Sequence, residues 1–290
     1  MSVPALAPPE SAEVLTRFQQ HFRLGRSASP AERLQEVVRA FAQLPYENLT
    51  KVLKEGSRGC RQPRLRGPAE VIDDHIASGT GGTCFSLTAT LLHLVRALGW
   101  PAEPILADRR YGPDTHCALL VWLDQQPHLI DPGFLLVQPI PLTERREHRL
   151  TTAFNEVVLR PLAASDRWEL STQQQGRSTY RLTFKTAPVD AGEFTRAWRA
   201  SFDWDMMNYP VLSRVLGDSQ LYVQGPRWQR RTRVAVDHQE LPPAELAARI
   251  AQEFGIAPDV VTQALAQLTA AQRPVATSLP VRTSSATSAT

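Results

Sequence analysis

Apolar residues recur at helical spacing along much of the first hundred residues. The segment that begins at Ser29-Pro30 has a cap residue, then proline at the first helical position, then apolar residues at helical intervals. The segment Phe85 to Leu98 carries one apolar stripe and stops at Gly99. Residues 11–100 therefore predict a set of helices, with a loop at the stretch 56–67, which is rich in Arg, Gly and Pro.

The apolar pattern changes at about residue 102. Up to about residue 190 it consists of short strand-like runs separated by turn-rich pieces; these runs are 117–123, 128–130, 156–159 and 180–184. They predict a small antiparallel barrel or sandwich. The stretch 192–270 returns to helical spacing, with two expected strands, 219–224 and 228–236, and a final expected helix pair, 243–254 and 258–268.

Composition and charge exclude several classes of protein. Of the 290 residues, 42% are hydrophobic and 21% are charged. The hydrophobic fraction is large enough to form a buried core. The net charge of +3 is too small to indicate a nucleic-acid partner. No apolar run approaches the ~20 residues that spanning a bilayer needs, and the N-terminus has no signal-peptide pattern. We therefore expect a cytoplasmic protein without a membrane partner.

The cysteines indicate neither a disulfide framework nor a metal site. Cys60, Cys84 and Cys117 are odd in number and form no CxxC pair, so reduced thiols are expected. His116 and Cys117 are adjacent, and neighbours on a strand point to opposite faces, which is poor spacing for a metal.

Cys84 stands where a glycine-containing loop meets a helix. The stretch Thr80-Gly81-Gly82-Thr83-Cys84-Phe85 places its thiol at the start of the expected helix. A helix N-terminus favours negative charge, so it lowers a thiol pKa and favours the nucleophilic thiolate. The unpaired N–H groups there, that of Cys84 among them, are suited to stabilise a tetrahedral oxyanion.

His116 and Asp131 complete an ordered set with Cys84. His116 lies at the start of one expected strand, and Asp131 follows the next. Nucleophile, base and orienting carboxylate in this order suit cysteine acyl transfer, in which the imidazole takes the thiol proton and the carboxylate holds its tautomer. Each residue alone is more often structural; their order and settings together favour catalysis.

The hairpin between the two strands places a condition on the site. For His116 and Asp131 to face each other directly, the hairpin must centre between Leu123 and Asp124. The turn-forming residues 124–127 centre about two residues later. A bulge, or a diagonal contact across twisted strands, must absorb the offset.

Four motifs in order give the chain a resemblance to the arylamine N-acetyltransferases, over about residues 12–265. The matching stretches are Leu44-Pro45-Tyr46-Glu47-Asn48-Leu49, Gly81-Gly82-Thr83-Cys84-Phe85, Thr115-His116 and Leu129-Ile130-Asp131-Pro132-Gly133-Phe134. The resemblance implies an α+β fold with a cysteine-protease- and transglutaminase-like catalytic core. Its expected parts are a helical bundle with the Cys (1–100), an antiparallel β-barrel with the His and Asp (101–191), an α/β lid (192–270) and a disordered tail (271–290).

The resemblance also implies a reaction and its substrates. Acetyl-CoA would acylate Cys84, CoA would leave, and an arylamine or hydrazine would take the acetyl group, with no bound cofactor. Phe134, Leu136 and Gln138 would line the acceptor pocket, while Gly133 and the region from Asn208 to Ser213 would approach CoA.

The chain departs from the family pattern around the nucleophile. The family usually has Arg-Gly-Gly-x-Cys-x-Glu-x-Asn, whereas Thr80, Ser86 and Thr88 stand at its Arg, Glu and Asn positions. Glu47 then needs another cationic partner, for which we consider Arg58 and Arg61, because an unpaired buried carboxylate is costly.

These departures keep other functions open. One is an amide synthase or cyclase that releases a chain bound to an acyl carrier protein. A hydrolase or a transglutaminase-like enzyme would use the same three residues with a different acceptor. The last alternative is a catalytically silent interaction protein with the same fold.

Overall fold

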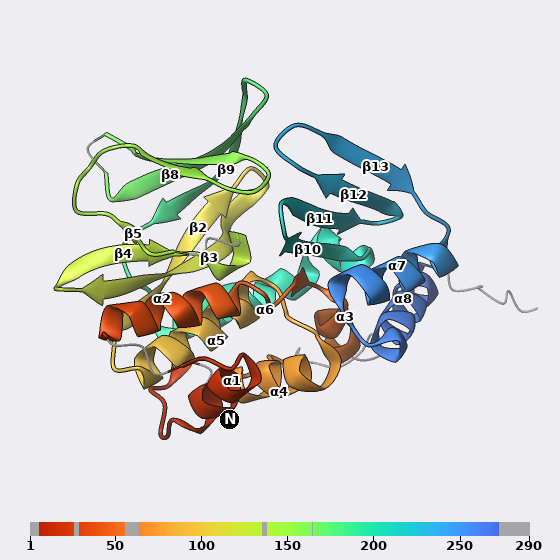
Figure 1. Ribbon diagram of the computed structural model, residues 1–290, viewed down its shortest axis with the longest axis horizontal. Helices are drawn as coiled ribbons and strands as arrows, with labels where there is room; N and C mark the ends of the chain where they lie inside the picture. Colours follow the sequence, from red (N-terminus) through yellow and green to blue (C-terminus); the bar gives the residue numbers. More distant parts are fainter. Residues whose placement is uncertain (1–5, 26–28, 56–63, 135–137, 164, 273–290) are drawn as a thin grey trace, which may run out of the picture.

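The computed structural model describes residues 6–25, 29–55, 64–134, 138–163 and 165–272. Residues 273–290 of the predicted tail and most of the predicted loop 56–67 lie outside these residues, whereas 271 and 272 end the last helix. An N-terminal layer of helices lies beneath two antiparallel sheets (Figure 1). The α+β class that the sequence predicts is confirmed.

The helical layer contains α1 (Glu13–His21), α2 (Pro30–Phe41), α3 (Leu49–Glu55), α4 (Pro68–Ser78) and α5 (Cys84–Ala97). The expected cap of α2 is present: the Ser29 hydroxyl accepts from Glu32 N, and the Glu32 carboxylate accepts from Ser29 N, at 3.2 and 3.0 Å. Helix α5 is buried on nearly every side and ends before Gly99, whose φ of 90° suits glycine. It forms the centre of the N-terminal core.

The larger sheet is a nearly closed barrel of eight strands in the order β5-β4-β3-β2-β9-β8-β7-β6. Its strands are β2 (Ala102–Arg109), β3 (Gly112–Leu123), β4 (Gln126–Ile130), β5 (Ile140–Pro141), β6 (His148–Thr151), β7 (Glu156–Pro161), β8 (Arg167–Gln174) and β9 (Arg177–Lys185). Each strand predicted in this region is found. The sequence did not single out β8, in which Trp168, Leu170 and Thr172 face inward between polar neighbours.

The second sheet has the order β1-β10-β11-β12-β13. Its strands are β1 (Tyr46–Glu47), β10 (Val211–Leu216), β11 (Ser219–Gln224), β12 (Arg227–Arg231) and β13 (Val236–Glu240). The single strand expected over 228–236 is wrong, because the Thr232 hydroxyl accepts from the amides of Val234 and Ala235 and turns the chain there.

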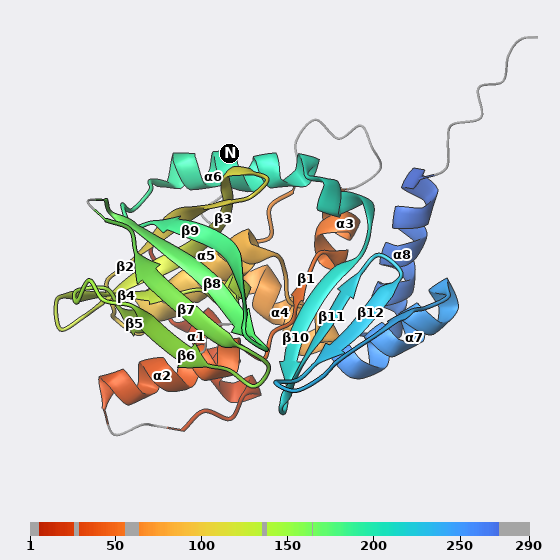
Figure 2. The same cartoon turned by 90° about the horizontal axis from the view of Figure 1, so that it is seen from above.

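Three helices complete the fold. The expected final pair is present as α7 (Pro243–Phe254) and α8 (Pro258–Gln272), packed on the second sheet. Helix α6 (Ala191–Ala200) instead runs beside α5, as the turned view shows (Figure 2), and Phe194 meets Phe85 edge to face at 5.3 Å between ring centroids. The start of α5 is thereby closed from that side.

Candidate active site

The loop before Cys84 is held against β1. The amide of Glu47 donates to Gly82 O at 3.0 Å, and Gly82 N donates to Pro45 O. A Cβ on Gly81 would lie 1.8 Å from Pro45 O, so only glycine allows this approach. Cys84 is the first residue of α5 and is 1% exposed.

His116 and Asp131 form a buried pair across β3 and β4. His116 Nε2 donates to Asp131 Oδ2 at 2.7 Å, and both side chains are 0% exposed. Leu123 pairs with Gln126, so the turn centres between Asp124 and Gln125, one residue after the centre that direct opposition requires and one before the centre that the composition predicted. No register shift occurs between β3 and β4; Asp131 lies just beyond the end of β4 and reaches His116 diagonally.

Gly133 shows how closely the candidate residues converge. It lies in the 3-10 turn η2 (Pro132–Phe134), which follows Asp131. A Cβ on Gly133 would lie 2.9 Å from both Cys84 Cβ and His116 Cε1. The structure therefore brings Cys84, His116, Asp131 and Gly133 together from three separate segments.

The surroundings of Cys84 favour its thiolate. A hydrogen bond from Cys117 lowers the pKa of the Cys84 thiol well below its usual range, helped by a hydrogen bond and charge from His116 and the charge of Arg109, against the opposing effect of burial. For His116, burial alone would lower the pKa, but the charge and hydrogen bond of Asp131 outweigh it and raise the pKa.

Cys117 is closer to the site than its position suggests. Its side chain packs in the helical core with Leu119, whereas Ala118 faces the barrel core, in keeping with the predicted alternation. Its Sγ also lies 3.4 Å from Thr88 Oγ1, within hydrogen-bond distance. Burial, and then the hydrogen bond with Cys84, raise the pKa of the Cys117 thiol well above its usual range. Cys60 lies outside the described residues.

Arg109 is a member of the site that the sequence did not reveal. Its Nη2 donates to His116 Nδ1 at 2.8 Å, and its Nη1 donates to the Tyr111 hydroxyl at 3.0 Å. His116 is thus hydrogen-bonded through both ring nitrogens. Arg109 ends β2, and sequence spacing alone gives no direction for a side chain at a strand end.

The buried Glu47 carboxylate has a cationic neighbour in Arg66. Glu47 accepts from the Thr50 amide and hydroxyl at 2.9 and 2.6 Å, and Arg66 Nη1 lies 3.9 Å from Glu47 Oε1. Arg66 also donates to Thr50 Oγ1 and to Gly81 O, each at 2.7 Å. Arg58 and Arg61 lie outside the described residues, so the expectation about them stays open.

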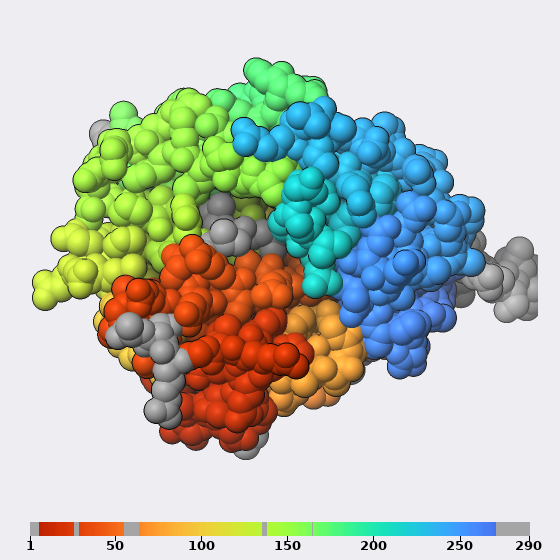
Figure 3. All heavy atoms as spheres, viewed as in Figure 1, coloured from red at the N-terminus to blue at the C-terminus, as the bar shows by residue number. Residues whose placement is uncertain are grey.

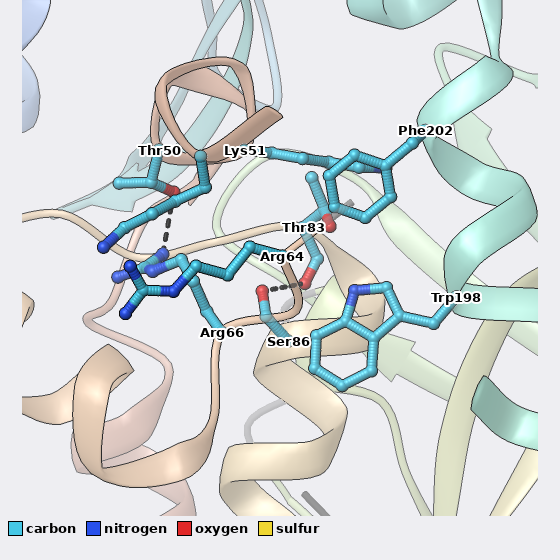
Figure 4. A pocket seen from close by; sticks show the side chains of 9 residues that line it. Thr50, Lys51, Arg64, Arg66, Thr83, Ser86, Trp198 and Phe202 are labelled. Carbon is cyan, nitrogen blue, oxygen red and sulfur yellow. Dashed lines mark hydrogen bonds between the residues drawn. The ribbon is translucent and has the colours of Figure 1, made fainter. Parts of the chain in front are cut away.

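A small cavity lies beside this network, behind the start of α5 (Figure 4). In it, Ser86 donates to Thr83 O, and Trp198 and Phe202 face the Thr83–Ser86 turn. Its lining residues are Thr50, Lys51, Lys54, Arg64, Arg66, Thr83, Ser86, Trp198 and Phe202. Hydroxyls and cationic side chains therefore surround Ser86, one of the positions at which the chain departs from the family motif.

The remaining predicted site residues are placed as follows. Phe134 is half-buried, packs against the barrel core and donates its amide to Asp131 Oδ1 at 2.9 Å. Gln138 is exposed, and Leu136 lies outside the described residues. Ser213 lies on β10 opposite Tyr46, and its hydroxyl accepts from Gln220.

The surface is hollowed between three parts of the molecule. The hollow lies between the barrel, the N-terminal segment and the start of the second sheet (Figure 3). Within the described ranges, no three His, Cys, Asp or Glu side chains are grouped to hold a metal ion. None of the helices described has the length and apolar character to cross a bilayer.

Sequence comparison identifies the family of this chain. A family model described as N-acetyltransferase matches residues 31–262. Among curated proteins, none has a significant sequence match to this chain.

Solved structures of arylamine N-acetyltransferases share the fold at low sequence identity. The enzyme from Nocardia farcinica has a TM-score of 0.76 at 22% identity, over 93% of this chain and 100% of that one. The enzyme from Mycobacterium abscessus has a TM-score of 0.74 at 23% identity, over 88% and 94%. That from Mycobacterium marinum, solved in complex with CoA, has a TM-score of 0.73 at 17% identity, over 88% and 97%. The protein belongs to the arylamine N-acetyltransferase family.

Proposed function

We propose that this protein transfers an acyl group from a CoA thioester, with acetyl-CoA as the reference donor, through Cys84 to an amine. One observation carries the proposal. A buried thiol with a lowered pKa stands beside an imidazole whose other ring nitrogen is bonded to a buried carboxylate. The CoA complex of the Mycobacterium marinum relative supports the choice of donor.

In the first half-reaction, Cys84 Sγ gives its proton to His116 Nδ1 and attacks the thioester carbonyl. The Cys84 amide, at the start of α5, is suited to stabilise the oxyanion. The carbon–sulfur bond to CoA then breaks, and the imidazolium returns the proton to the departing thiolate. Asp131 holds the Nε2–H tautomer and stabilises the imidazolium.

In the second half-reaction, the amine nitrogen attacks acyl-Cys84. Deprotonated His116 takes the amine proton, the bond to Cys84 Sγ breaks, and the thiol is restored. No oxidant, metal or bound cofactor is needed to balance these steps.

We propose an arylamine or a hydrazine as the acceptor. Phe134 presents an aromatic, half-buried side chain three residues beyond Asp131, and burying an aromatic ring gains about 25 cal/mol per Å². A charged alkylamine loses hydration on entering such a site. An arylamine is largely neutral at pH 7, so its lone pair is free to attack.

A catalytically silent protein is less well supported. The sequence kept that alternative open because Thr80, Ser86 and Thr88 replace the family Arg, Glu and Asn. Arg66 supplies a cation beside Glu47 and also donates to the carbonyl of Gly81 in the nucleophile loop. Despite the changed motif, the buried Glu47 and the nucleophile loop therefore both keep a cationic neighbour.

The test is intact-mass spectrometry after mixing with acetyl-CoA. We expect one acetyl adduct, mapped to Cys84 and absent from Cys84→Ala. After CoA is removed, aniline-type and alkylamine acceptors are compared in wild type and in Phe134→Ala, using one acyl donor. Wild type should prefer the aromatic amine, and Phe134→Ala should lose most of that preference. Absence of any acyl adduct would contradict the transferase function, and a retained preference would place the acceptor pocket elsewhere.

A further inference from the structure

Arg109 brings a positive charge to the thiol side of the candidate site, and no carboxylate of the described residues forms an ion pair with it. Its side-chain hydrogen bonds go to uncharged groups, the Tyr111 hydroxyl and His116 Nδ1. Its Nε is buried and has no hydrogen-bond partner within the described part of the chain. Buried cationic groups are normally paired with an acid, so this guanidinium has capacity for an anionic ligand.

A β-bulge directs this side chain. Ala107 pairs with His116, whereas Arg109 pairs with Gly112, so the register of β2 and β3 shifts between these two pairs. A bulge turns a side chain out of the regular alternation and is frequent beside active sites. The alanine opposite His116 leaves room for the guanidinium that follows two residues later.

The carboxylates nearest in the sequence are already paired elsewhere. Asp108 lies 2.9 Å from Lys185 and 3.1 Å from Arg167, and Asp114 lies 2.6 Å from Lys185. Asp131 is bonded to the opposite nitrogen of His116. The acids of this hairpin thus neutralise other cations and leave Arg109 alone.

Other groups near Arg109 add positive charge. Besides burial, Arg231, Arg109 and Arg110 each lower the pKa of Arg181, so each of these three guanidinium groups lies close enough to Arg181 to repel it. Among the described residues, none of these four arginines forms an ion pair with a carboxylate. The surroundings of Arg109 therefore suit an anion rather than a cation.

We propose that Arg109 binds a carboxylate carried by a substrate of the Cys84 site, which makes it a specificity-determining residue. The inference rests on the proposed acyl transfer and narrows its substrates. The carboxylate belongs either to the acyl group, as in a dicarboxylic acyl thioester, or to the acceptor, as in an aminobenzoate. The acyl transfer itself keeps the steps described above.

Binding a carboxylate has a second effect at His116. The guanidinium occupies Nδ1, the nitrogen that must accept the Cys84 proton. A carboxylate forms stronger, charge-assisted hydrogen bonds with the guanidinium than the imidazole does. An anionic substrate therefore competes with Nδ1 for Arg109 and favours the state in which Nδ1 is free to act as the base, a state that acetyl-CoA must reach without this help.

The first experiment compares isosteric acyl donors. Malonyl-CoA carries a carboxylate at the position where isovaleryl-CoA carries an isopropyl group. The rate of adduct formation on Cys84 is followed by intact mass. Wild type should favour malonyl-CoA by about tenfold or more, the effect of one good charged contact. Arg109→Gln should abolish this ratio, and Arg160→Gln, an exposed arginine paired with Glu147 on the same barrel, should keep it.

The second experiment separates the two sources of the carboxylate. Acetyl-Cys84 is prepared, freed of CoA and mixed with 4-aminobenzoate or 4-aminobenzamide. A preference for malonyl-CoA assigns the carboxylate to the acyl group. A preference for 4-aminobenzoate that Arg109→Gln abolishes assigns it to the acceptor. If Cys84 is acylated but neither pair shows a preference, the inference is overturned and the transferase function stands.

A third measurement needs no variant and no acyl donor. Iodoacetate and iodoacetamide are isosteric, and each alkylates a thiolate with loss of iodide. The ratio of their rates at Cys84 should exceed the same ratio for glutathione by about tenfold. If all three thioesters fail to acylate Cys84, the proposed function fails. If, in that case, the ratio of the iodoacetate rate to the iodoacetamide rate at Cys84 equals the ratio for glutathione, the proposed role of Arg109 is contradicted as well.

Discussion

Arg66 lies 3.9 Å from the carboxylate of Glu47, and the side chains are 4% and 0% exposed. The pair joins two segments that meet beneath the nucleophile loop. The arginine precedes α4, whereas the family resemblance placed its counterpart at the position of Thr80. A cation can therefore come from another segment and still lie beside the same buried acid.

Replacing Arg66 by Met should destabilise the protein by about 3 kcal/mol, because it leaves Glu47 buried without a cation. Chemical denaturation measures the change in the free energy of unfolding. Arg64→Met is the matched control, because its side chain is 70% exposed and its loss should cost little. The double variant Glu47→Gln/Arg66→Met should recover part of the loss; a single variant as stable as wild type would remove the pair's structural role.

Asp131→Asn should lower the rate of acyl transfer by roughly 10³–10⁴-fold, because the amide cannot hold His116 in its tautomer or stabilise the imidazolium. Cys84→Ala should show no transfer. Single-turnover acylation by acetyl-CoA measures both, and the thermal midpoint of each variant shows whether it folds. Full activity in either folded variant would refute the assigned role.

Cys117→Ala should raise the pKa of Cys84, since the hydrogen bond from Cys117 is the largest cause of its lowering. The rate of iodoacetamide alkylation at Cys84, followed against pH by peptide mapping, gives the midpoint. In wild type this midpoint should lie below that of an ordinary thiol, with Cys84 modified before Cys117. Cys117→Ser keeps a donor and should shift the midpoint less than the alanine variant does; identical midpoints in all three proteins would contradict the prediction.

His75 should make the protein less stable in acid. Burial lowers its pKa to about 4, so between pH 6.5 and about 4 the unfolded chain binds a proton that the folded protein does not. Stability is then lost as the pH falls through this window, by as much as about 3 kcal/mol, less for partial exposure. Thermal midpoints across this range should fall more gently in His75→Gln, whereas His128→Gln, at a partly exposed site, should keep the wild-type slope.

The sequence predicted what depends on local pattern and on order along the chain. The N-cap of α2, the thiol at the start of α5, the strand that carries His116 and the strand before Asp131 each follow from residues that are neighbours in sequence. The sequence also indicated that Asp131 would not lie directly opposite His116, and the diagonal contact between the two side chains accounts for this offset.

What the sequence missed depends on side-chain direction and on distant pairing. A bulge aims Arg109 at His116, and no periodicity reveals a bulge. Arg66 reaches Glu47 only after α4 and α5 have packed. The contact of the Cys117 thiol with Cys84 depends on the packing of β3 against α5, because the alternation of strand residues sets the face and not the neighbour across it.

The two residues of β1 have a consequence for synthesis of the chain. Tyr46 pairs with Ser213 of β10 on one side and bridges Gly82 of the nucleophile loop on the other. The loop is therefore connected through β1 to a strand that is translated much later. At ordinary elongation rates the ribosome needs about 10 to 30 seconds to cover that interval. Nascent chains arrested before residue 211 should therefore carry a nucleophile loop that is not yet fixed in place. Release of the second sheet from the exit tunnel, rather than completion of the helical layer, would then fix the loop that positions Cys84.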